Sequence, residues 1–207
     1  MTPATSSLNP LPVAAMSAGW LAPLLMFWLS VWGPLRPFDY PGGNLLPSPV
    51  AVAASLVMCA ALWVVPSPYY RIRRFEQNGR IYERLGVRLF RHLVPDGDLA
   101  NRWHRRQEPG FRVISSRRDA LLLAQRTRQS ERSHLVFLAV GFLSALYAVE
   151  IGWSGWAWYL GAGNVLVNLY PVMLQRYTRA RVYRLGVTNA DMQTLTRQSR
   201  EDRAGQA

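Results

Sequence analysis

The sequence contains no lysine, and its first 35 residues carry no charge of either sign. The first charged residue is Arg36, and a soluble domain of this size rarely has so long a stretch without a charge. Only one cysteine is present, Cys59, so an intrachain disulfide is excluded and a cysteine-ligated zinc site is disfavoured. The sequence also contains no cofactor motif and no metal cluster, so we expect neither group.

What the sequence does contain is long apolar blocks. Half of its 207 residues are hydrophobic, and they alternate in blocks with charged stretches instead of being spread periodically. A bilayer-spanning helix needs about 20 predominantly apolar residues. The sequence therefore predicts an all-α integral membrane protein with about four transmembrane helices. The candidate spans are residues 13–32, 49–65, 135–151 and 156–174.

The distribution of arginine predicts the orientation. All 24 basic residues are arginines, and the formal net charge is +12. Residues 67–132 hold 16 arginines against seven acidic residues, and residues 175–207 hold seven against three. Arginine-rich segments beside spans are retained in the cytoplasm. We therefore expect a multi-pass protein of the cell membrane with both termini cytoplasmic: transmembrane helices in 1–66, a cytoplasmic loop in 67–132, transmembrane helices in 133–174 and a basic tail in 175–207.

The cytoplasmic loop begins with a basic amphipathic pattern. Residues 71–93 place apolar side chains at helical spacing among arginines, which is typical of interfacial helices lying in the headgroup plane. An alternative is that some of these arginines bind the phosphates of an activated donor such as coenzyme A, or of a lipid headgroup. Tyr69 and Tyr70, just after the second span, are interpreted as interface anchors.

A histidine and a carboxylate lie where the third span begins. Glu131 and His134 are three residues apart and share one face of a helix. A histidine at a wet membrane edge, oriented by a carboxylate, is suited to act as a general base on a hydroxyl. An ordinary salt-bridged helix start explains the same pair.

Polar residues also follow one side of the fourth span. Asn164, Asn168 and Gln175 lie at spacings of four and seven on an otherwise apolar helix. Polar groups inside a membrane usually face a bundle interior or a cavity. The stripe points toward the cytoplasmic edge that carries His134, although interhelical hydrogen bonding alone would account for it.

Three sequence blocks in order carry a family resemblance. The blocks are residues 75–80, 82–90 and 95–98 with Asn101; then Glu131 and His134; then residues 168–181. Over roughly residues 70–185 the chain resembles the glycosyl-4,4'-diaponeurosporenoate acyltransferases of carotenoid biosynthesis. The resemblance implies an integral membrane enzyme that esterifies a sugar hydroxyl of a glycosylated carotenoid acid with a fatty acyl group.

The resemblance places the motifs of the family on particular residues of this chain. The Glu-x-x-His of the family falls on Glu131 and His134, and its Asn-x-x-Pro falls on Asn168 and Pro171. Its Gln-Arg-Tyr-Asn-Arg falls on Gln175, Arg176, Tyr177, Thr178 and Arg179, with Thr178 in place of the usual Asn. Threonine keeps a hydrogen-bonding group, so this departure is a mild one.

These residues give a catalytic hypothesis. His134 deprotonates the acceptor hydroxyl, and Glu131 holds the imidazole and stabilises its cationic form. Asn168 and Gln175 position the acceptor or donate to the oxyanion of the tetrahedral intermediate.

The expected partners follow from the same hypothesis. Arg176 and Arg179 bind phosphates of an acyl donor, either acyl-coenzyme A or an acyl carrier protein, and the acceptor is lipidic. The alternative is a non-enzymatic membrane scaffold that binds anionic lipid or a partner protein through its arginine-rich loop. Nucleic-acid binding would explain the positive charge, but not why arginines flank apolar segments.

Overall fold

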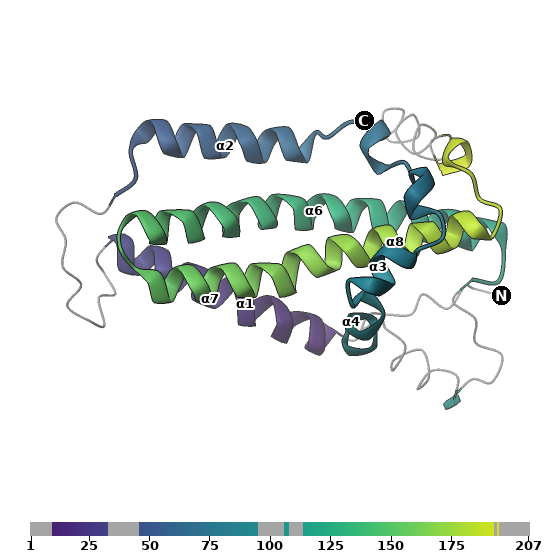
Figure 1. Cartoon of the computed structure of the whole chain (residues 1–207), viewed down its shortest axis with the longest axis horizontal. Helices are drawn as coiled ribbons and strands as arrows, with labels where there is room; N and C mark the ends of the chain where they lie inside the picture. Colours follow the sequence, from purple (N-terminus) through teal and green to yellow (C-terminus); the bar gives the residue numbers. More distant parts are fainter. Residues whose placement is uncertain (1–9, 33–45, 95–105, 108–113, 193, 195–207) are drawn as a thin grey trace. The chain divides into compact units, whose positions relative to one another are not determined.

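The computed structural model describes residues 10–32, 46–94, 106–107, 114–192 and 194. Every regular element in these ranges is a helix, which confirms the all-helical fold class (Figure 1). The α-helices are α1 (Pro10–Trp32), α2 (Pro49–Trp63), α3 (Arg80–Arg84), α4 (Val87–Leu93), α6 (Arg117–Glu150), α7 (Ser154–Asn164) and α8 (Tyr170–Arg184). Two short 3₁₀ helices, η1 (Ser67–Tyr70) and η2 (Arg74–Glu76), follow α2, and a π-helical segment, η3 (Val165–Leu169), joins α7 to α8.

The chain forms two compact units, each built from two separate stretches. Unit 1 comprises Met1–Val64 and His134–Leu169, and unit 2 comprises Val65–Ser133 and Tyr170–Ala207. The chain passes between the units inside α6, and again between η3 and α8.

In unit 1 a single stripe of α1 forms the core. Trp20, Leu24, Phe27 and Val31 recur at spacings of four and three, so they share one helical face, and all four are buried. They pack against Ala145, Ala148, Trp153 and Leu160 of α6, the following turn and α7. Contacts between α1 and α7 agree with their neighbouring positions in Figure 1. The other face of α1 leaves apolar side chains exposed, namely Leu21, Leu25, Met26 and Trp32.

A glycine turn ends α6 and starts α7. Gly152 has φ +79°, a left-handed conformation that residues with a Cβ rarely adopt. Its N–H donates to the carbonyl of Val149 at 3.0 Å, and the N–H of Trp153 donates to that of Ala148 at 2.7 Å. This is the Schellman arrangement that satisfies the last carbonyls of a helix. The turn places the chain where Trp153 enters the core of unit 1.

In unit 2 the first half of α6 packs against α8 and the segment after it. Ala120 and Ala124, one turn apart on α6, are buried together with Val182 and Val187. Asn189 adds a polar clamp, since its Oδ1 accepts from the N–H of Ile72 at 3.0 Å and its Nδ2 donates to the Ile72 carbonyl at 3.1 Å. The clamp joins the chain that enters unit 2 to the segment that follows α8.

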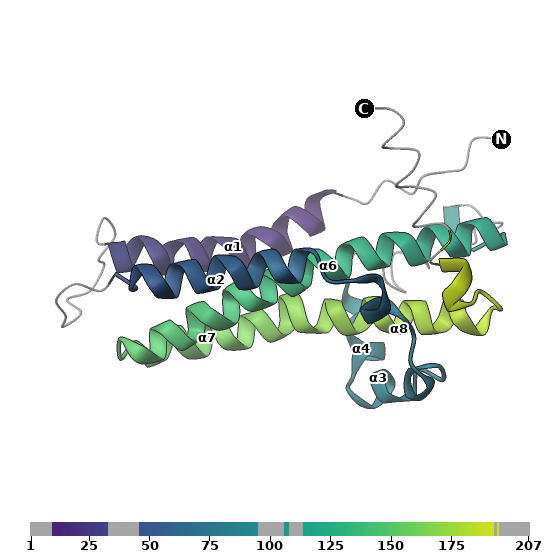
Figure 2. The same cartoon turned by 90° about the horizontal axis from the view of Figure 1, so that it is seen from above.

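The amphipathic stretch forms η2, α3 and α4, and α3 and α4 lie against α8 (Figure 2). Tyr82 and Val87 are buried against Tyr177. Ile81, Leu85 and Leu89, spaced by four, are instead exposed. This part of unit 2 therefore buries one side on α8 and leaves several apolar side chains exposed.

By length and composition, one helix among the described residues, α6, is suited to cross a membrane. A second span is obtained if α2 and its continuation Ser67–Glu76, bent by 66°, are counted as one. The expectation of four spans is not established by this criterion and stays a prediction. The stretch expected to form the fourth span is divided between α7, η3 and the start of α8.

Candidate active site

A chain of hydrogen bonds in unit 1 ends on His134. The Nδ2 of Asn164 donates to the main-chain carbonyl of Leu138 at 2.8 Å. The Nδ2 of Asn168 donates to Oδ1 of Asn164, also at 2.8 Å, and Nδ1 of His134 lies 3.2 Å from Oδ1 of Asn168. Both asparagines are 2% exposed. The structure thus brings together His134 and Asn168, two of the residues selected from the sequence.

The direction of this chain determines the state of the imidazole. A carbonyl can only accept, so Leu138 requires the amide nitrogen of Asn164 to face it, and the oxygen of Asn164 must then accept from Asn168. The oxygen of Asn168 is left to face His134, so Nδ1 of the ring must carry a hydrogen. When the imidazole is neutral, its lone pair is consequently on Nε2, the atom that a general base uses.

The backbone around the two asparagines is also unusual. Asn168 lies in the π-helical segment η3, and Pro171 follows it by three residues. Proline has no N–H to donate to the carbonyl four residues earlier, that of Val167, so the regular α-helical ladder cannot continue here. Single π turns within helices occur frequently at functional sites.

Close packing holds Asn164 in position. Gly141 of α6 lies so near that a Cβ built on it would be 2.6 Å from Cγ of Asn164 and 2.6 Å from Cζ2 of Trp20. Only a residue without a side chain fits between them. The position of Asn164 therefore depends on Gly141 as well as on its own hydrogen bonds.

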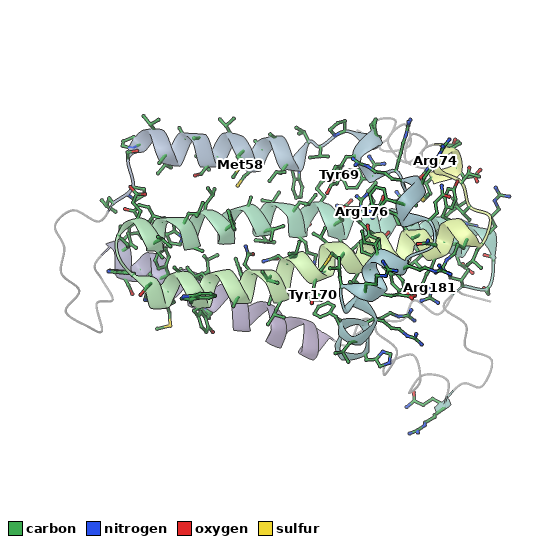
Figure 3. The ribbon with its side chains drawn as sticks, viewed as in Figure 1. Met58, Tyr69, Arg74, Tyr170, Arg176 and Arg181 are labelled. Carbon is green, nitrogen blue, oxygen red and sulfur yellow. The ribbon has the colours of Figure 1, made fainter. Side chains whose placement is uncertain are left out.

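Unit 2 contains a cluster of buried ion pairs. Glu131 is fully buried, and its carboxylate accepts from Nη1 of Arg176 at 3.2 Å and from Nη2 of Arg179. Nε of Arg176 donates to Oε1 of Glu76 at 2.7 Å, and Nη2 donates to Oε2 at 2.9 Å. The two predicted phosphate-binding arginines are therefore both engaged with carboxylates. Arg176 also stacks on Tyr69, with its Cζ 5.3 Å from the ring centre (Figure 3).

The pairing of Glu76 shifts the pKa values around it. Burial alone raises the pKa of the Glu76 carboxyl, but hydrogen bonds from Arg176 and Tyr82 outweigh it and the net pKa is lowered. Burial, together with donation of the hydroxyl to Glu76, raises the pKa of Tyr82 to about 12. Glu76 is thus held as a carboxylate, with Tyr82 as a permanent hydrogen-bond donor to it.

Three arginine side chains gather around the ring of Tyr70. It is 4% exposed, and Arg128, Arg132 and Arg179 lie with their Cζ atoms 4.7, 5.9 and 5.9 Å from its ring centre. Aromatic faces attract guanidinium groups in this way. Tyr70 is therefore buried beneath arginines instead of being presented to headgroups as an interface anchor.

Gln175, the remaining predicted binding residue, contacts α6. Gln175 donates from Nε2 to Oγ of Ser130 at 3.1 Å, which joins α8 to α6 within unit 2. Residues 95–98 and Asn101, which contribute to the family resemblance, lie outside the described residues. The described residues contain no group of three or more His, Cys, Asp or Glu side chains that could hold a metal ion.

Sequence reasoning did not select Glu76, Tyr82 or Tyr70 as site residues. Glu76 and Tyr82 are both within blocks that carry the family resemblance, so a signal was present. Their partner, Arg176, is 100 residues from Glu76 in sequence, and helical spacing gives no information about such a pair.

Comparison with known proteins identifies the family. The sequence model for glycosyl-4,4'-diaponeurosporenoate acyltransferase matches residues 66–187, more than half of the chain. The chain belongs to this family. It is accordingly an acyltransferase, and the resemblance noted from its sequence blocks is confirmed. No curated protein and no solved structure gave a significant match to the chain.

The extent of the family match is informative. Residues 66–187 include His134 and Asn168 of unit 1 and the buried ion pairs of unit 2, whereas α1 and α2 lie outside the match. An acyltransferase family favours the enzymatic reading of the arginine-rich loop over the scaffold reading.

Proposed function

We propose that this acyltransferase esterifies a sugar hydroxyl of a glycosylated carotenoid, or of a similar glycolipid-like acceptor, with a fatty acyl group. We further propose that it acts at the cytoplasmic face of the cell membrane, with four spans in residues 13–32, 49–65, 135–151 and 156–174. The family description supports the reaction and acceptor class. The arginine content of residues 67–132 and 175–207 supports the orientation.

Exposed apolar side chains support the membrane assignment. None of the α2 residues is buried, and Val50, Leu56 and Val57 are each at least 66% exposed. Figure 3 labels Met58 on the same helix, which is also exposed. Contact of these apolar groups with water is unfavourable in free energy, whereas contact with lipid tails is not. The exposure of the apolar side chains Ile81, Leu85 and Leu89 supports an interfacial position for α3 and α4.

The observation that carries the mechanism is the hydrogen-bond chain that ends on His134. Because the chain fixes hydrogen on Nδ1, Nε2 of His134 is free to take the proton of the acceptor hydroxyl. We assign the orienting role to Asn168, whose oxygen accepts from Nδ1. Glu131, for which that role was predicted, serves instead as the counter-ion of Arg176 and Arg179.

We propose that the acyl transfer proceeds through a tetrahedral intermediate. The hydroxyl oxygen attacks the thioester carbonyl carbon of an acyl-coenzyme A or acyl carrier protein while its proton moves to Nε2 of His134. A C–O bond forms, and the carbonyl electrons move to oxygen. Collapse of the tetrahedral intermediate breaks the C–S bond, and the departing thiolate receives the proton from the imidazolium. The products are an ester and a free thiol.

We propose that unit 2 serves the acyl donor. Arg176, with its guanidinium bonded to Glu76 and Glu131, holds the buried cluster together. Gln175 fixes α8 on α6 through Ser130. Arg179 donates to Glu131 from Nη2, whereas its Nε and Nη1 have no hydrogen-bond partner.

The first experiment measures ester formation by the purified chain in detergent, from labelled acyl-coenzyme A and a glycosylated carotenoid acid. Loss of a general base typically lowers turnover by about 10²- to 10⁴-fold, so His134→Ala is expected to fall in that range. His92→Ala is a matched control, because His92 lies on α4 and has no role in the mechanism. Turnover of the His134 variant within a few-fold of wild type, with helix content retained, would exclude the histidine mechanism.

A further inference from the structure

A small pocket in unit 2 has polar, cationic and aromatic residues in its walls. Its walls include Ser67, Tyr70, Arg71, Arg128, Arg179 and Asn189. It holds about 330 Å³ of space not filled by protein atoms, part of which is open solvent. This is room for a small charged group, but not for a whole nucleotide or a lipid.

Arg179 contributes to this pocket a buried charge whose hydrogen-bonding capacity is only partly used. It is 1% exposed, and Nη2 donates to Glu131, whereas Nε and Nη1 have no hydrogen-bond partner. Leaving a buried charged donor unsatisfied costs several times more than a surface contact gains. The Nε and Nη1 donors of Arg179 could therefore each be satisfied by an acceptor oxygen of an anion, and the charge of the guanidinium favours such a ligand.

The surroundings of Arg179 point to the same kind of ligand. The hydroxyl of Tyr70 is buried without a partner, and Arg128 and Arg132 gather on the same ring as Arg179. Glu131 pairs with Arg179 and is shared with Arg176, so Arg179 does not have this carboxylate to itself. An additional anion beside Arg179 would add to the neutralisation of its buried charge.

We propose that this pocket binds a phosphate group. Arg179 and Arg128 supply charge-assisted donors, and Ser67 and Tyr70 supply hydroxyls, a combination that suits a tetrahedral oxyanion. Ser67 is already held there, since its Oγ accepts from Nη2 of Arg128 at 2.8 Å. The inference rests on the proposed function in taking the phosphate to belong to the acyl donor. An anionic lipid headgroup is a second source of the same chemistry.

The test is a binding measurement on the full chain in nanodiscs of neutral phosphatidylcholine. The thermal midpoint is followed with sodium phosphate against sodium chloride of equal ionic strength, and separately with coenzyme A. A third series replaces part of the neutral lipid with phosphatidic acid. Arg128→Gln and Ser67→Ala alter the pocket, whereas Arg126→Gln removes the same charge from an exposed position two residues away on α6.

Phosphate or coenzyme A is expected to raise the midpoint of the wild type and of Arg126→Gln. Arg128→Gln should weaken the apparent affinity by about tenfold or more, because a hydrogen bond to a charged group is lost. Ser67→Ala, a smaller change, should weaken it in the same direction. A response only to phosphatidic acid, with the same dependence on Arg128, supports a phosphate site filled by lipid.

The proposal is overturned if no probe raises the midpoint, or if Arg126→Gln loses as much affinity as Arg128→Gln. Binding requires no turnover, so His134→Ala should bind coenzyme A as the wild type does. If that variant binds normally while the wild type forms no ester, the pocket stands and the proposed reaction fails. The two hypotheses are therefore separated by experiment.

Discussion

At the scale of single residues, Gly141 of α6 lies against the side-chain amide of Asn164. In Gly141→Ala the new methyl group would displace Asn164, which accepts the hydrogen bond from Asn168. We expect turnover to fall by about tenfold or more, together with a loss of stability of about 1–3 kcal/mol from overpacking. Ester formation and the thermal midpoint measure the two effects.

Gly161 provides the matched control for this substitution. A Cβ on Gly161 would have no atom within 4 Å, so Gly161→Ala should keep full activity and leave stability unchanged or slightly raised. Equal activity in both variants would show that Asn164 does not support the imidazole.

Glu76 makes the stability of unit 2 depend on pH. Its carboxyl has a lowered pKa in the folded chain, so its contribution is fully present above the unfolded pKa, about 4.3, and is lost as the pH falls through the folded value. Breaking a buried pair costs about 3–5 kcal/mol. Glu76→Gln should therefore be destabilised at pH 7, and the difference from wild type should shrink below about pH 4. Thermal midpoints from pH 3 to 7 test this, and a constant difference across that range would contradict it.

The sequence indicated some of these residues but not how they pair. His134 and Asn168 were selected because a polar residue in an apolar block is conspicuous, and they lie 3.2 Å apart. The partner expected for His134, Glu131, was chosen because a sequence displays neighbours along one helix, at spacings of three or four residues. The structure gives Glu131 two arginines from α8, a relation that depends on how helices pack.

At the scale of elements, the π-helical segment η3 determines how Asn168 faces its neighbours. In Pro171→Ala the restored N–H can join the regular ladder, which removes the widened turn and rotates Asn164 and Asn168 relative to α8. We expect turnover to fall by about tenfold while stability is kept, because the variant gains a hydrogen bond. Pro23→Ala in α1 is the control for replacing a proline inside a helix. Wild-type turnover in Pro171→Ala would show that η3 does not matter for the reaction.

Helix limits were harder to predict than helix content. The stretch before His134 and the span after it were expected as separate segments, because composition changes from arginine-rich to apolar at that point. The structure contains one helix there, α6, 34 residues long. A change in polarity does not interrupt backbone hydrogen bonding, and α6 contains no proline that would.

At the scale of the whole molecule, the proposed topology places residues 67–132 and the tail on one side and the first connection on the other. In a Cys59→Ser background, Asn101→Cys and Ser199→Cys should react with a membrane-impermeant maleimide only in inside-out vesicles. Gly43→Cys should react only in right-side-out vesicles. Reaction of all three from one side would contradict the four-span arrangement.

Charge asymmetry and apolar blocks can suggest this topology from sequence alone, whereas the criterion of helix length and composition accepts one described helix, or two with the bent pair. The difference has a physical basis. In the proposed topology the fourth span would be divided between α7, η3 and the start of α8, so it would not be one regular helix.

The exposure of the α2 side chains has a consequence for how well this helix tolerates substitution. No side chain of this helix is buried within the described part of its own chain, and the family match begins just after it. The identity of individual α2 residues is then less constrained by packing within the chain than that of the buried α1 stripe, whose side chains pack against α6 and α7. We expect substitutions that keep α2 apolar and equally long to be tolerated better than substitutions within the α1 stripe.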